Sequence, residues 1–293
     1  MCTFNGARFL NEQLKTIVSQ DWPADEVIII DDASTDETFA ILKKWELKFS
    51  GLFKIYQNDK NLGYNRNFEK AISLCSGDLI AIADQDDIWL QDKLSSLVPL
   101  FNDQEVLLAH GASVTLKNGR LHFFSGQLNR YHLFEGNDSR RLFLLNQISG
   151  HNMMFRKSLA VSAFPLPLHL SYDWWLAVQA TAAGKIKAVH RYLVYHRKHG
   201  SNTFFSKMRV HNPLSILDTM QCFRQIKGLS PDSLAFLDEF ILHLNRIREN
   251  PKRYTRPYYR FLRKNSALIF GHKKRILLQL NHVLTASKFS KKW

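Results

Sequence analysis

The sequence predicts an α/β fold in which a mostly parallel sheet is flanked by helices and followed by a helical, basic C-terminal extension. Two observations carry this prediction. Short apolar, β-branched segments alternate with helical patterns in the first half of the chain, and polar residues come directly after those segments. The 293 residues are 45% hydrophobic and 23% charged, which is typical of a folded globular chain. The composition excludes disordered, collagen-like and coiled-coil proteins.

The apolar segments of the first half have the composition of buried strands. Residues 26–30 (EVIII) are the clearest case, and similar segments follow at residues 53–56, 78–83 and 106–109. Together with the segments between them they give the order β-α-β-α. This order favours parallel neighbouring strands with helices on the faces of the sheet.

The segments between these strands have helical periodicity. Apolar side chains fall on one face of a helix in residues 9–18, and they do so again in residues 64–75. Ser34 and Glu37 are three residues apart, which is the spacing of a capping box, so we expect a helix to begin there.

The first strand of such a sheet is expected before residues 2–6 (CTFNG), yet the chain starts inside it. We therefore expect in-frame codons upstream of Met1 that encode about four to eight apolar, β-branched residues, the length of an ordinary strand.

The second half of the chain is less regular. Residues 152–155 and 186–190 are predicted to be short strands, and residues 173–183 are predicted to form a helix that ends at Gly184. From about Pro213 onward the pattern is helical. We expect one domain over residues 1–205, with a first half of about 1–100 and a second half of about 101–205. A helical, basic extension over residues 206–293 follows it.

The formal net charge of +14 is concentrated at the C-terminal end. Residues 1–250 carry 28 Lys and Arg against 26 Asp and Glu, whereas residues 251–293 carry twelve Lys and Arg and no acidic residue. A basic segment of this kind fits an anionic surface, either lipid headgroups or nucleic acid, although a solvated helix face has the same composition.

The remaining composition favours a cytoplasmic protein. No apolar run approaches the roughly 18 residues that a membrane span needs, and residues 1–10 lack the features of a signal peptide. Cys2, Cys75 and Cys222 are odd in number and far apart in the sequence, so neither a disulfide framework nor a metal-binding cysteine motif is indicated.

Carboxylates follow two of the predicted strands. Asp31 and Asp32 come after residues 26–30, and Asp84 and Asp86 come after residues 78–83. In open α/β sheets ligands bind beyond the carboxyl ends of the strands. Carboxylates gathered there would repel one another unless a cation were bound, and Mg²⁺ or Mn²⁺ suits such oxygen ligands and usually also holds substrate phosphates.

Five motifs occur in one order along the chain: CTFNG (2–6), VIIIDDASTDET (27–38), NLG (61–63), ADQDDIW (83–89) and YDWW (172–175). As a set they resemble the family 2 inverting glycosyltransferases, which have the Rossmann-like GT-A fold. DQDDIW and YDWW are similar to the bacterial rhamnosyltransferase-like branch, whose members build cell-surface polysaccharide from nucleotide sugars. The resemblance covers roughly residues 1–205.

The resemblance implies a set of nucleotide-sugar-binding residues. Thr3 and Asn5 match the loop that holds the nucleotide, and Asp31 matches the carboxylate that accepts a hydrogen bond from the pyrimidine N3–H. The stretch 61–67 matches a segment that helps to close the donor pocket, and Arg197 has two readings, contact with the diphosphate or pairing with a surface acid. The donor-binding residues so implied are Thr3, Asn5, Asp31, Asp32, Asn61, Gly63, Asn67, Asp84 and Arg197.

The resemblance also implies a metal site and a catalytic base. Asp84 and Asp86 match the Asp-x-Asp motif of the family, in which the second carboxylate binds the Mn²⁺ or Mg²⁺ that bridges the diphosphate. His199 matches a histidine that completes the metal site or contacts the diphosphate. Asp173 matches the catalytic base. The chain departs from the family pattern at His196, where a tyrosine is usual.

Most other conspicuous residues are expected to have structural roles. One of Trp174 and Trp175 is expected to pack in the core and the other to stack on an acceptor sugar. His151 receives no functional role, and the segment 150–152 is taken as a turn before a strand.

These implications together predict a metal-dependent inverting glycosyltransferase. The expected donor is a nucleotide sugar, dTDP-rhamnose or a UDP-sugar, and the expected acceptor is a saccharide or a lipid-linked saccharide at the cell surface. Two alternatives stay open: a UDP-hexose or N-acetylhexosamine transferase of the same fold, and a non-catalytic membrane- or nucleic-acid-binding protein that uses the basic segment. For the favoured function, residues 251–293 are expected to bind an anionic membrane on its inner face, and no nucleic-acid partner is expected.

Overall fold

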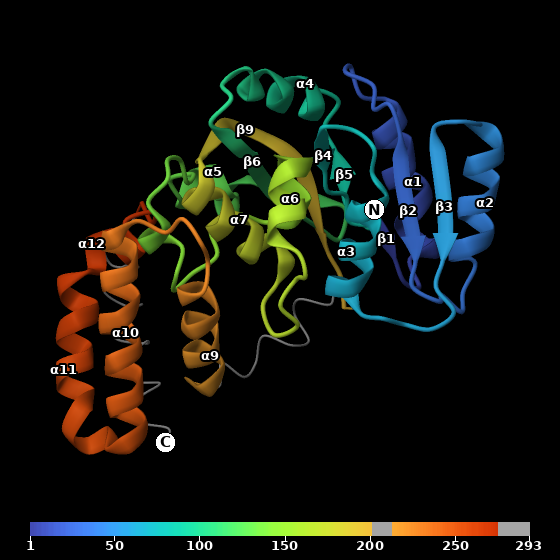
Figure 1. Cartoon of the computed structure of the whole chain (residues 1–293). Coiled ribbons are helices and arrows are strands. Elements are labelled where there is room, and N and C mark those ends of the chain that lie inside the picture. The colour runs from blue at the N-terminus through green and yellow to red at the C-terminus, as the bar shows by residue number, and fades with distance from the viewer. Residues whose placement is uncertain (201–212, 275–293) are drawn as a thin grey trace.

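The computed structural model describes residues 1–200 and 213–274. The strands form the interior of the molecule and helices pack around them, which confirms the predicted α/β class (Figure 1). The helices α9 to α12 gather at one end of the molecule, far from α2 and β3 at the other end.

A three-stranded parallel sheet forms the N-terminal part, in the order β1-β2-β3. Its strands are β1 (Cys2–Thr3), β2 (Val27–Asp31) and β3 (Phe53–Gln57), and its helices are α1 (Ala7–Val18), α2 (Thr38–Lys48) and α3 (Tyr64–Leu74). The strands predicted at 26–30 and 53–56 and the helices predicted at 9–18 and 64–75 are therefore confirmed. All five residues of β2 are buried, as expected for a strand between two others with helices on its faces.

The capping box predicted at Ser34 and Glu37 is wrong. Glu37 is the residue that precedes α2, and its side chain makes no cap hydrogen bond. The Ser34 hydroxyl instead donates to Asp31, and the carboxylate of Asp36 accepts from the Thr38 amide at 3.0 Å. Ser34 does not cap the helix because its hydroxyl donates to the buried carboxylate of Asp31 at the end of β2. The carboxylate of Asp36 instead accepts from an amide of the first turn of α2.

The second sheet has six strands in the order β4-β8-β6-β9-β5, with β7 paired to the outer part of β6. The strands are β4 (Leu79–Ala81), β5 (Ile88–Trp89), β6 (Val106–Lys117), β7 (Arg120–His122), β8 (Met153–Arg156) and β9 (Lys185–Lys198). Only the pair β6–β9 is parallel, and the other four pairs are antiparallel. The predicted parallel order thus holds for the first sheet, whereas the second is mixed because its strands pair across long connections rather than through successive βαβ units.

Short helices and single turns connect the strands of the second sheet. In chain order they are α4 (Lys93–Leu97), η1 (Val98–Asn102), η2 (Phe123–Ser125), α5 (Gln127–Arg130), η3 (Ser139–Arg141), η4 (Gly150–Asn152), α6 (Lys157–Ala163) and α7 (Tyr172–Ala183). The helix predicted at 173–183 is α7, and Gly184 ends it as expected.

Four helices follow, α9 (Pro213–Arg224), α10 (Pro231–Glu249), α11 (Pro251–Lys264) and α12 (Ser266–Phe270). They share a hydrophobic core with the second sheet: the ring of Phe223 lies 5.6 Å from that of Phe143 and stacks on Trp175 at 6.3 Å. No helix in the described ranges is long and apolar enough to cross a bilayer.

Candidate active site

Asp31 ends β2 and is completely buried. One carboxylate oxygen accepts from the hydroxyls of Thr3, at 2.9 Å, and Ser34, and the other accepts from the Ser34 amide at 3.0 Å and the Gln57 side chain at 3.1 Å. These four donors account for the roughly four lone pairs of a carboxylate. Asp31 therefore joins the ends of β1 and β3 to the loop after β2.

Asp32 organises the loop 61–63 that precedes α3. Its carboxylate accepts from the amides of Leu62 at 2.9 Å and Gly63 at 3.0 Å, and the side chain of Asn61 donates to its carbonyl at 3.3 Å. Gly63 has φ +80°, in the left-handed region that favours glycine. The structure thus brings Asp32, Asn61 and Gly63 into one loop.

Asn67 and Asn5 have different surroundings. Asn67 is buried and donates to the carbonyl of Ile30 at 3.1 Å, so it supports β2 from α3. Asn5 is exposed, has φ +49°, and accepts from the amide of Thr35 at 2.8 Å. Thr3 and Asn5 therefore join the loop after β1 to the loop after β2.

The acidic loop, residues 84–87, lies between β4 and β5. Burial, together with the negative charges of Asp86 and Asp173, raises the pKa of Asp84 to about 7. Electrostatic effects of this kind require proximity. The carboxylates predicted for metal binding and for proton transfer therefore face one site, although they come from β4 and α7.

Asp86 lies against two of the predicted site residues, Arg197 and His199. Its carboxylate is 2.7 Å from Nε2 of His199, and its carbonyl accepts from Nε of Arg197 at 2.9 Å. The Arg197 guanidinium also pairs with Glu12 and lies over the ring of Phe9 at 4.7 Å. The structure therefore brings Asp86, Arg197 and His199 together.

Asp84, Asp87 and His151 form a cluster whose ligand atoms all lie within 4.8 Å of one another. Nδ1 of His151 is 3.8 Å from a carboxylate oxygen of each aspartate. Asp87 is buried, its Oδ2 has no hydrogen-bond partner, and burial beside Asp84 and Asp86 raises its pKa strongly. Carboxylate oxygens with one imidazole suit Mn²⁺, so the donor set around this loop fits a divalent cation.

Lys93 lies behind this cluster and is completely buried. Its ammonium donates to the carbonyl of His151 at 2.7 Å and lies 3.5 Å from the centre of the Trp89 ring. Burial lowers the pKa of Lys93 strongly, while the charges of Asp87 and Asp84 act in the opposite direction. Lys93 also donates to the carbonyl of Ile82 at 3.4 Å, so its side chain joins η4 to the segment that leads into the acidic loop.

Asp173 lies in the first turn of α7 and is half-buried. Its carboxylate accepts from the amide of Trp174 at 2.7 Å and, across the site, from the amide of Gly150 at 3.1 Å. Burial raises the pKa of Asp173, and hydrogen bonds from Ser171, Gly150 and Trp174 lower it. A raised pKa and a position beside the acidic loop are properties of a general base.

The two tryptophans after Asp173 both have structural partners. The indole of Trp174 donates to the carbonyl of Leu142 at 2.6 Å, and that of Trp175 donates to the carbonyl of Ala163 at 2.8 Å. Each ring also contacts Phe223. Trp175 packs in the core as expected for one of the pair, and Trp174 is partly buried against the same core.

The sequence-based prediction missed three residues of this site: Asp87, Lys93 and His151. Asp87 stands next to the Asp-x-Asp motif, so its place in the run DQDD was the available signal. No sequence signal marked Lys93 or His151, because their roles depend on burial and on the antiparallel pairing that places η4 beside the acidic loop.

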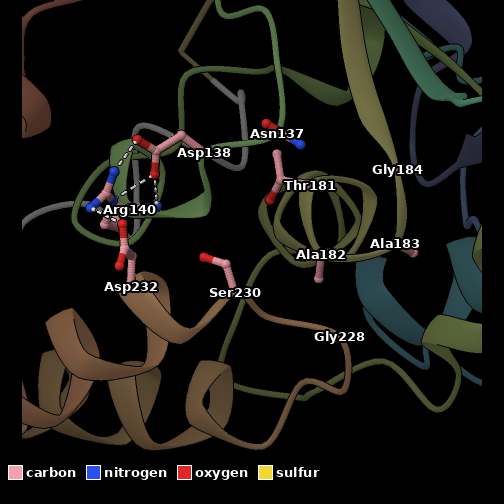
Figure 2. Close-up of a pocket in the computed structure, with 10 residues that line it drawn as sticks. All are labelled: Asn137, Asp138, Arg140, Thr181, Ala182, Ala183, Gly184, Gly228, Ser230 and Asp232. Atoms are coloured by element: carbon pink, nitrogen blue, oxygen red, sulfur yellow. Dashed lines mark hydrogen bonds and ion pairs between the residues drawn. The ribbon is translucent and has the colours of Figure 1, made fainter.

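A separate cavity of about 550 Å³ lies at the other end of α7, near the start of α10 (Figure 2). Its charged side chains pair with one another: Arg140 pairs with Asp138 at 2.8 Å and with Asp232 at 3.4 Å. It is roughly 15 Å from Asp173 along the helix. This cavity is therefore not part of the candidate active site.

The sequence of this chain is similar to known glycosyltransferases. The sequence profile of Glycosyl transferase family 2 matches residues 1–162. The dTDP-rhamnosyl transferase RfbG of Shigella flexneri is 32% identical over 133 residues, which are 44% of this chain and 44% of that protein. An uncharacterized glycosyltransferase of Nostoc sp. is 25% identical over 69% of this chain and 65% of its own length. The chain thus spans less than two thirds of these relatives.

Two solved structures share the fold. Staphylococcus aureus TarS 1–349, in complex with UDP-GlcNAc, has a TM-score of 0.64 and 19% identity over 98% of this chain and 86% of that chain. The mannosyltransferase PcManGT of Pyrobaculum calidifontis, in complex with GDP-Man and Mn²⁺, has a TM-score of 0.59 and 18% identity over 100% of this chain and 85% of that chain. At this identity the likeness concerns the fold, and it confirms the predicted GT-A architecture. With the profile covering more than half of its residues, the chain belongs to glycosyl transferase family 2.

Proposed function

We propose that this protein is a metal-dependent inverting glycosyltransferase that moves a sugar from a nucleoside-diphosphate donor to a saccharide acceptor. The observation that carries the proposal is the convergence of Asp84, Asp86 and Asp173 on one site beyond the ends of the strands, where the charges of Asp86 and Asp173 contribute to the raised pKa of Asp84. Family membership and the RfbG and TarS likenesses support the same reaction class.

The residues of the site have distinct roles in the proposed reaction. Asp84, Asp86 and His199 would hold Mn²⁺ or Mg²⁺, and Asp87 and His151 extend this donor set. When bound, a divalent cation stabilises the negative charge of a leaving diphosphate. The loops organised by Asp31 and Asp32, with Thr3, Asn5, Asn61, Gly63 and Asn67, would receive the nucleotide.

Asp173 would act as the base. Its carboxylate removes the proton of the acceptor hydroxyl while that oxygen attacks the anomeric carbon, and the bond from this carbon to the diphosphate breaks on the opposite face. One attack from the opposite face inverts the anomeric centre. The Gly150 amide, at 3.1 Å, keeps the carboxylate oriented as it takes the proton.

The proposed donor is dTDP-rhamnose, because RfbG, a dTDP-rhamnosyl transferase, is 32% identical over its matched part. UDP-linked hexoses and N-acetylhexosamines are the alternative, in line with the UDP-GlcNAc complex of TarS. For Asp31, the proposed contact with the pyrimidine N3–H requires one of its present hydrogen bonds to be replaced, since the carboxylate already has four donors.

The proposed acceptor is a lipid-linked or cell-surface saccharide, reached from the cytoplasmic face of a membrane. α11 supports this part, since it exposes six basic side chains: Lys252, Arg253, Arg256, Arg260, Arg263 and Lys264. α10 and α11 project toward the same side of the molecule as the carboxyl end of β3 (Figure 1). The apolar clusters at 276–278, 280 and 283–284, which also motivated a membrane contact, lie outside the described residues.

The test is a panel of donors that scores release of nucleoside diphosphate with Mn²⁺, with Mg²⁺ and with EDTA. We expect release from dTDP-rhamnose in the presence of either metal and none with EDTA. Release from UDP-hexoses alone would select the alternative donor class. No turnover of any nucleotide sugar, together with a salt-sensitive shift of a nucleic-acid probe, would favour the non-catalytic alternative.

A further inference from the structure

The carboxylate of Asp173 is held from two different elements. Oδ1 accepts from the amide of Trp174 at 2.7 Å, a bond within α7 itself. Oδ2 accepts from the amide of Gly150 at 3.1 Å, and Gly150 belongs to η4, 23 residues earlier in the chain. The direction of Oδ2 therefore depends on where η4 places a backbone amide.

His151 of η4 lies beside the acidic loop. The carbonyl of His151 accepts from the buried Lys93 ammonium at 2.7 Å, and its ring stacks on His196 at 4.6 Å. Nδ1 of His151 lies 3.8 Å from Oδ2 of Asp84 and from Oδ2 of Asp87, just beyond hydrogen-bond distance. Consecutive residues of η4 thus touch the two halves of the site, Asp173 through Gly150 and the acidic loop through His151.

Residue 150 has no room for a side chain. A Cβ atom there would lie 2.1 Å from the hydroxyl oxygen of Tyr172 and 2.8 Å from its Cζ. Tyr172 is buried and its ring packs on Phe68 at 4.4 Å, so it cannot easily yield. The close approach of η4 to the start of α7, and with it the Gly150–Asp173 hydrogen bond, requires glycine.

We propose that Gly150 and His151 are positioning residues: the Gly150 amide orients the carboxylate of Asp173, and His151 holds that amide in register with the acidic loop at 84–87. The proposal rests on the proposed function, because it takes Asp173 as the base. It explains why a three-residue turn reaches both carboxylate groups that the reaction needs.

The central variant is Gly150→Ala, since the added Cβ must push η4 away from Tyr172. We expect kcat to fall at least about tenfold, because small misplacements of a catalytic group are costly. Binding of UDP or dTDP with MnCl₂ should stay within about twofold, since the Gly150 amide bonds to Asp173 and not to the proposed nucleotide loops. The acidic limb of the kcat profile should move to higher pH, because the lost N–H bond is one that lowers the pKa of Asp173.

Two further variants separate positioning from folding. Gly150→Ala with Tyr172→Phe removes the hydroxyl that the Cβ would meet first, so kcat should recover part of its loss. His151→Phe keeps a ring against His196 but removes Nδ1. At saturating MnCl₂, which offsets the loss of a metal ligand, we expect it still to lower kcat, with a melting temperature near that of the wild type.

The outcomes distinguish this proposal from the one on which it rests. Folded Gly150→Ala and His151→Phe proteins with wild-type kcat and an unmoved acidic limb would overturn the positioning role, provided that Asp173→Asn abolishes transfer. If Asp173→Asn itself transferred sugar normally, the base assignment and the positioning role would both be overturned.

Discussion

Asp173 is the residue on which the proposed chemistry depends most directly. It lies in the first turn of α7, where a carboxylate is favoured by the helix dipole, so a purely structural cap is the competing interpretation. A cap and a base differ in what an amide can replace. The side chain of asparagine can still accept one of the two backbone hydrogen bonds, but it cannot take a proton.

We therefore expect Asp173→Asn to melt near the wild type and to bind nucleoside diphosphate with Mn²⁺ about as well, while sugar transfer falls by at least about 100-fold. Loss of one capping bond costs only about 1 kcal/mol. The measurements are thermal unfolding, calorimetric binding and initial rates, with the exposed Asp25→Asn as the matched control. Near-normal transfer in the folded variant would make Asp173 a cap.

Asp84 gives a prediction about pH and stability. Its pKa is raised from the usual 3.8 to about 7 by burial and by Asp86 and Asp173. Between those values the folded state holds a proton that the unfolded chain releases. The metal-free protein therefore loses stability as the pH rises through about 7, and metal binding, which needs the carboxylate, strengthens over the same range.

Asp84→Asn should accordingly raise the melting temperature of the metal-free protein at pH 8 and change it little near pH 4, since the amide removes the repulsion that the ionised carboxylate creates. It should also reduce the rise in melting temperature that MnCl₂ produces. Differential scanning calorimetry in EDTA and in MnCl₂ at both pH values tests this, with Asp25→Asn as the control. A metal-free variant that is less stable than the wild type at pH 8 would contradict it.

At the scale of secondary-structure elements, α3 and α7 are joined by one buried amide. The Asn65 side chain donates to the carbonyls of Leu170 at 2.7 Å and Pro167 at 3.0 Å and accepts from the amide of Tyr172 at 3.2 Å. These bonds link a helix of the first sheet to the helix that carries Asp173. Asn65 thus fixes α3, beside the proposed nucleotide loops, relative to α7 and Asp173, the proposed base.

Asn65→Ala should lower the free energy of unfolding by about 2–4 kcal/mol, because each buried group left without a partner costs about 1–3 kcal/mol. Urea unfolding at fixed pH measures this. The exposed Ser73→Ala, which also removes a side-chain hydrogen bond from α3, should change it by no more than about 0.5 kcal/mol. Equal losses of unfolding free energy in the two variants would show that the buried hydrogen bonds of Asn65 contribute no more to stability than the exposed one of Ser73.

The elements with a strong periodic pattern were predictable from the sequence. α1, α3 and α7 begin and end within a few residues of the predicted limits, because an amphipathic face or a terminal glycine specifies each locally. β6 and β9 were predicted as short segments, yet they extend over 12 and 14 residues. Their outer halves are stabilised by pairing with each other, and β6 also pairs with β7; no local sequence pattern predicts these pairings.

The residues of the candidate site also divide into those that a local sequence pattern predicts and those that it does not. Asp31, Asp84 and Asp86 could be placed from the rule that ligands bind beyond the carboxyl ends of strands, because each follows a recognisable strand. Lys93 could not, since a lysine in a polar stretch gives no sign that burial will place its ammonium beneath the acidic loop. Roles that arise from packing between distant segments need the three-dimensional structure.

At the scale of the whole molecule, the C-terminal helices are part of the same body as the second sheet. Residues of α9 to α12 lie in one hydrophobic cluster with Phe143, Trp175 and other residues of the sheet and its helices. A surface on α11 is therefore carried in a fixed relation to the second half of the site. This fixed relation is important for the proposed acceptor, which is held in a membrane.

The exposed basic face of α11, defined as Lys252, Arg253, Arg256, Arg260, Arg263 and Lys264, should bind anionic lipid. No acidic residue occurs in residues 251–293 to neutralise it. Each Lys or Arg near an anionic leaflet contributes about 1 kcal/mol, so three neutral substitutions should weaken binding by more than about tenfold. The variant is Arg253→Gln with Arg256→Gln and Arg260→Gln, measured by cosedimentation with phosphatidylserine-containing vesicles.

The matched control neutralises three exposed lysines at the other end of the molecule, Lys15, Lys44 and Lys48 of α1 and α2. It removes the same net charge, so it should leave vesicle binding within about twofold if the α11 face is the contact, and it should weaken binding equally if only net charge matters. Binding of the wild type should fall with added salt, because exposed charges are screened. Wild-type binding to neutral phosphatidylcholine vesicles as strong as to anionic ones would exclude an electrostatic attachment, and contact with the membrane would then have to come from apolar side chains.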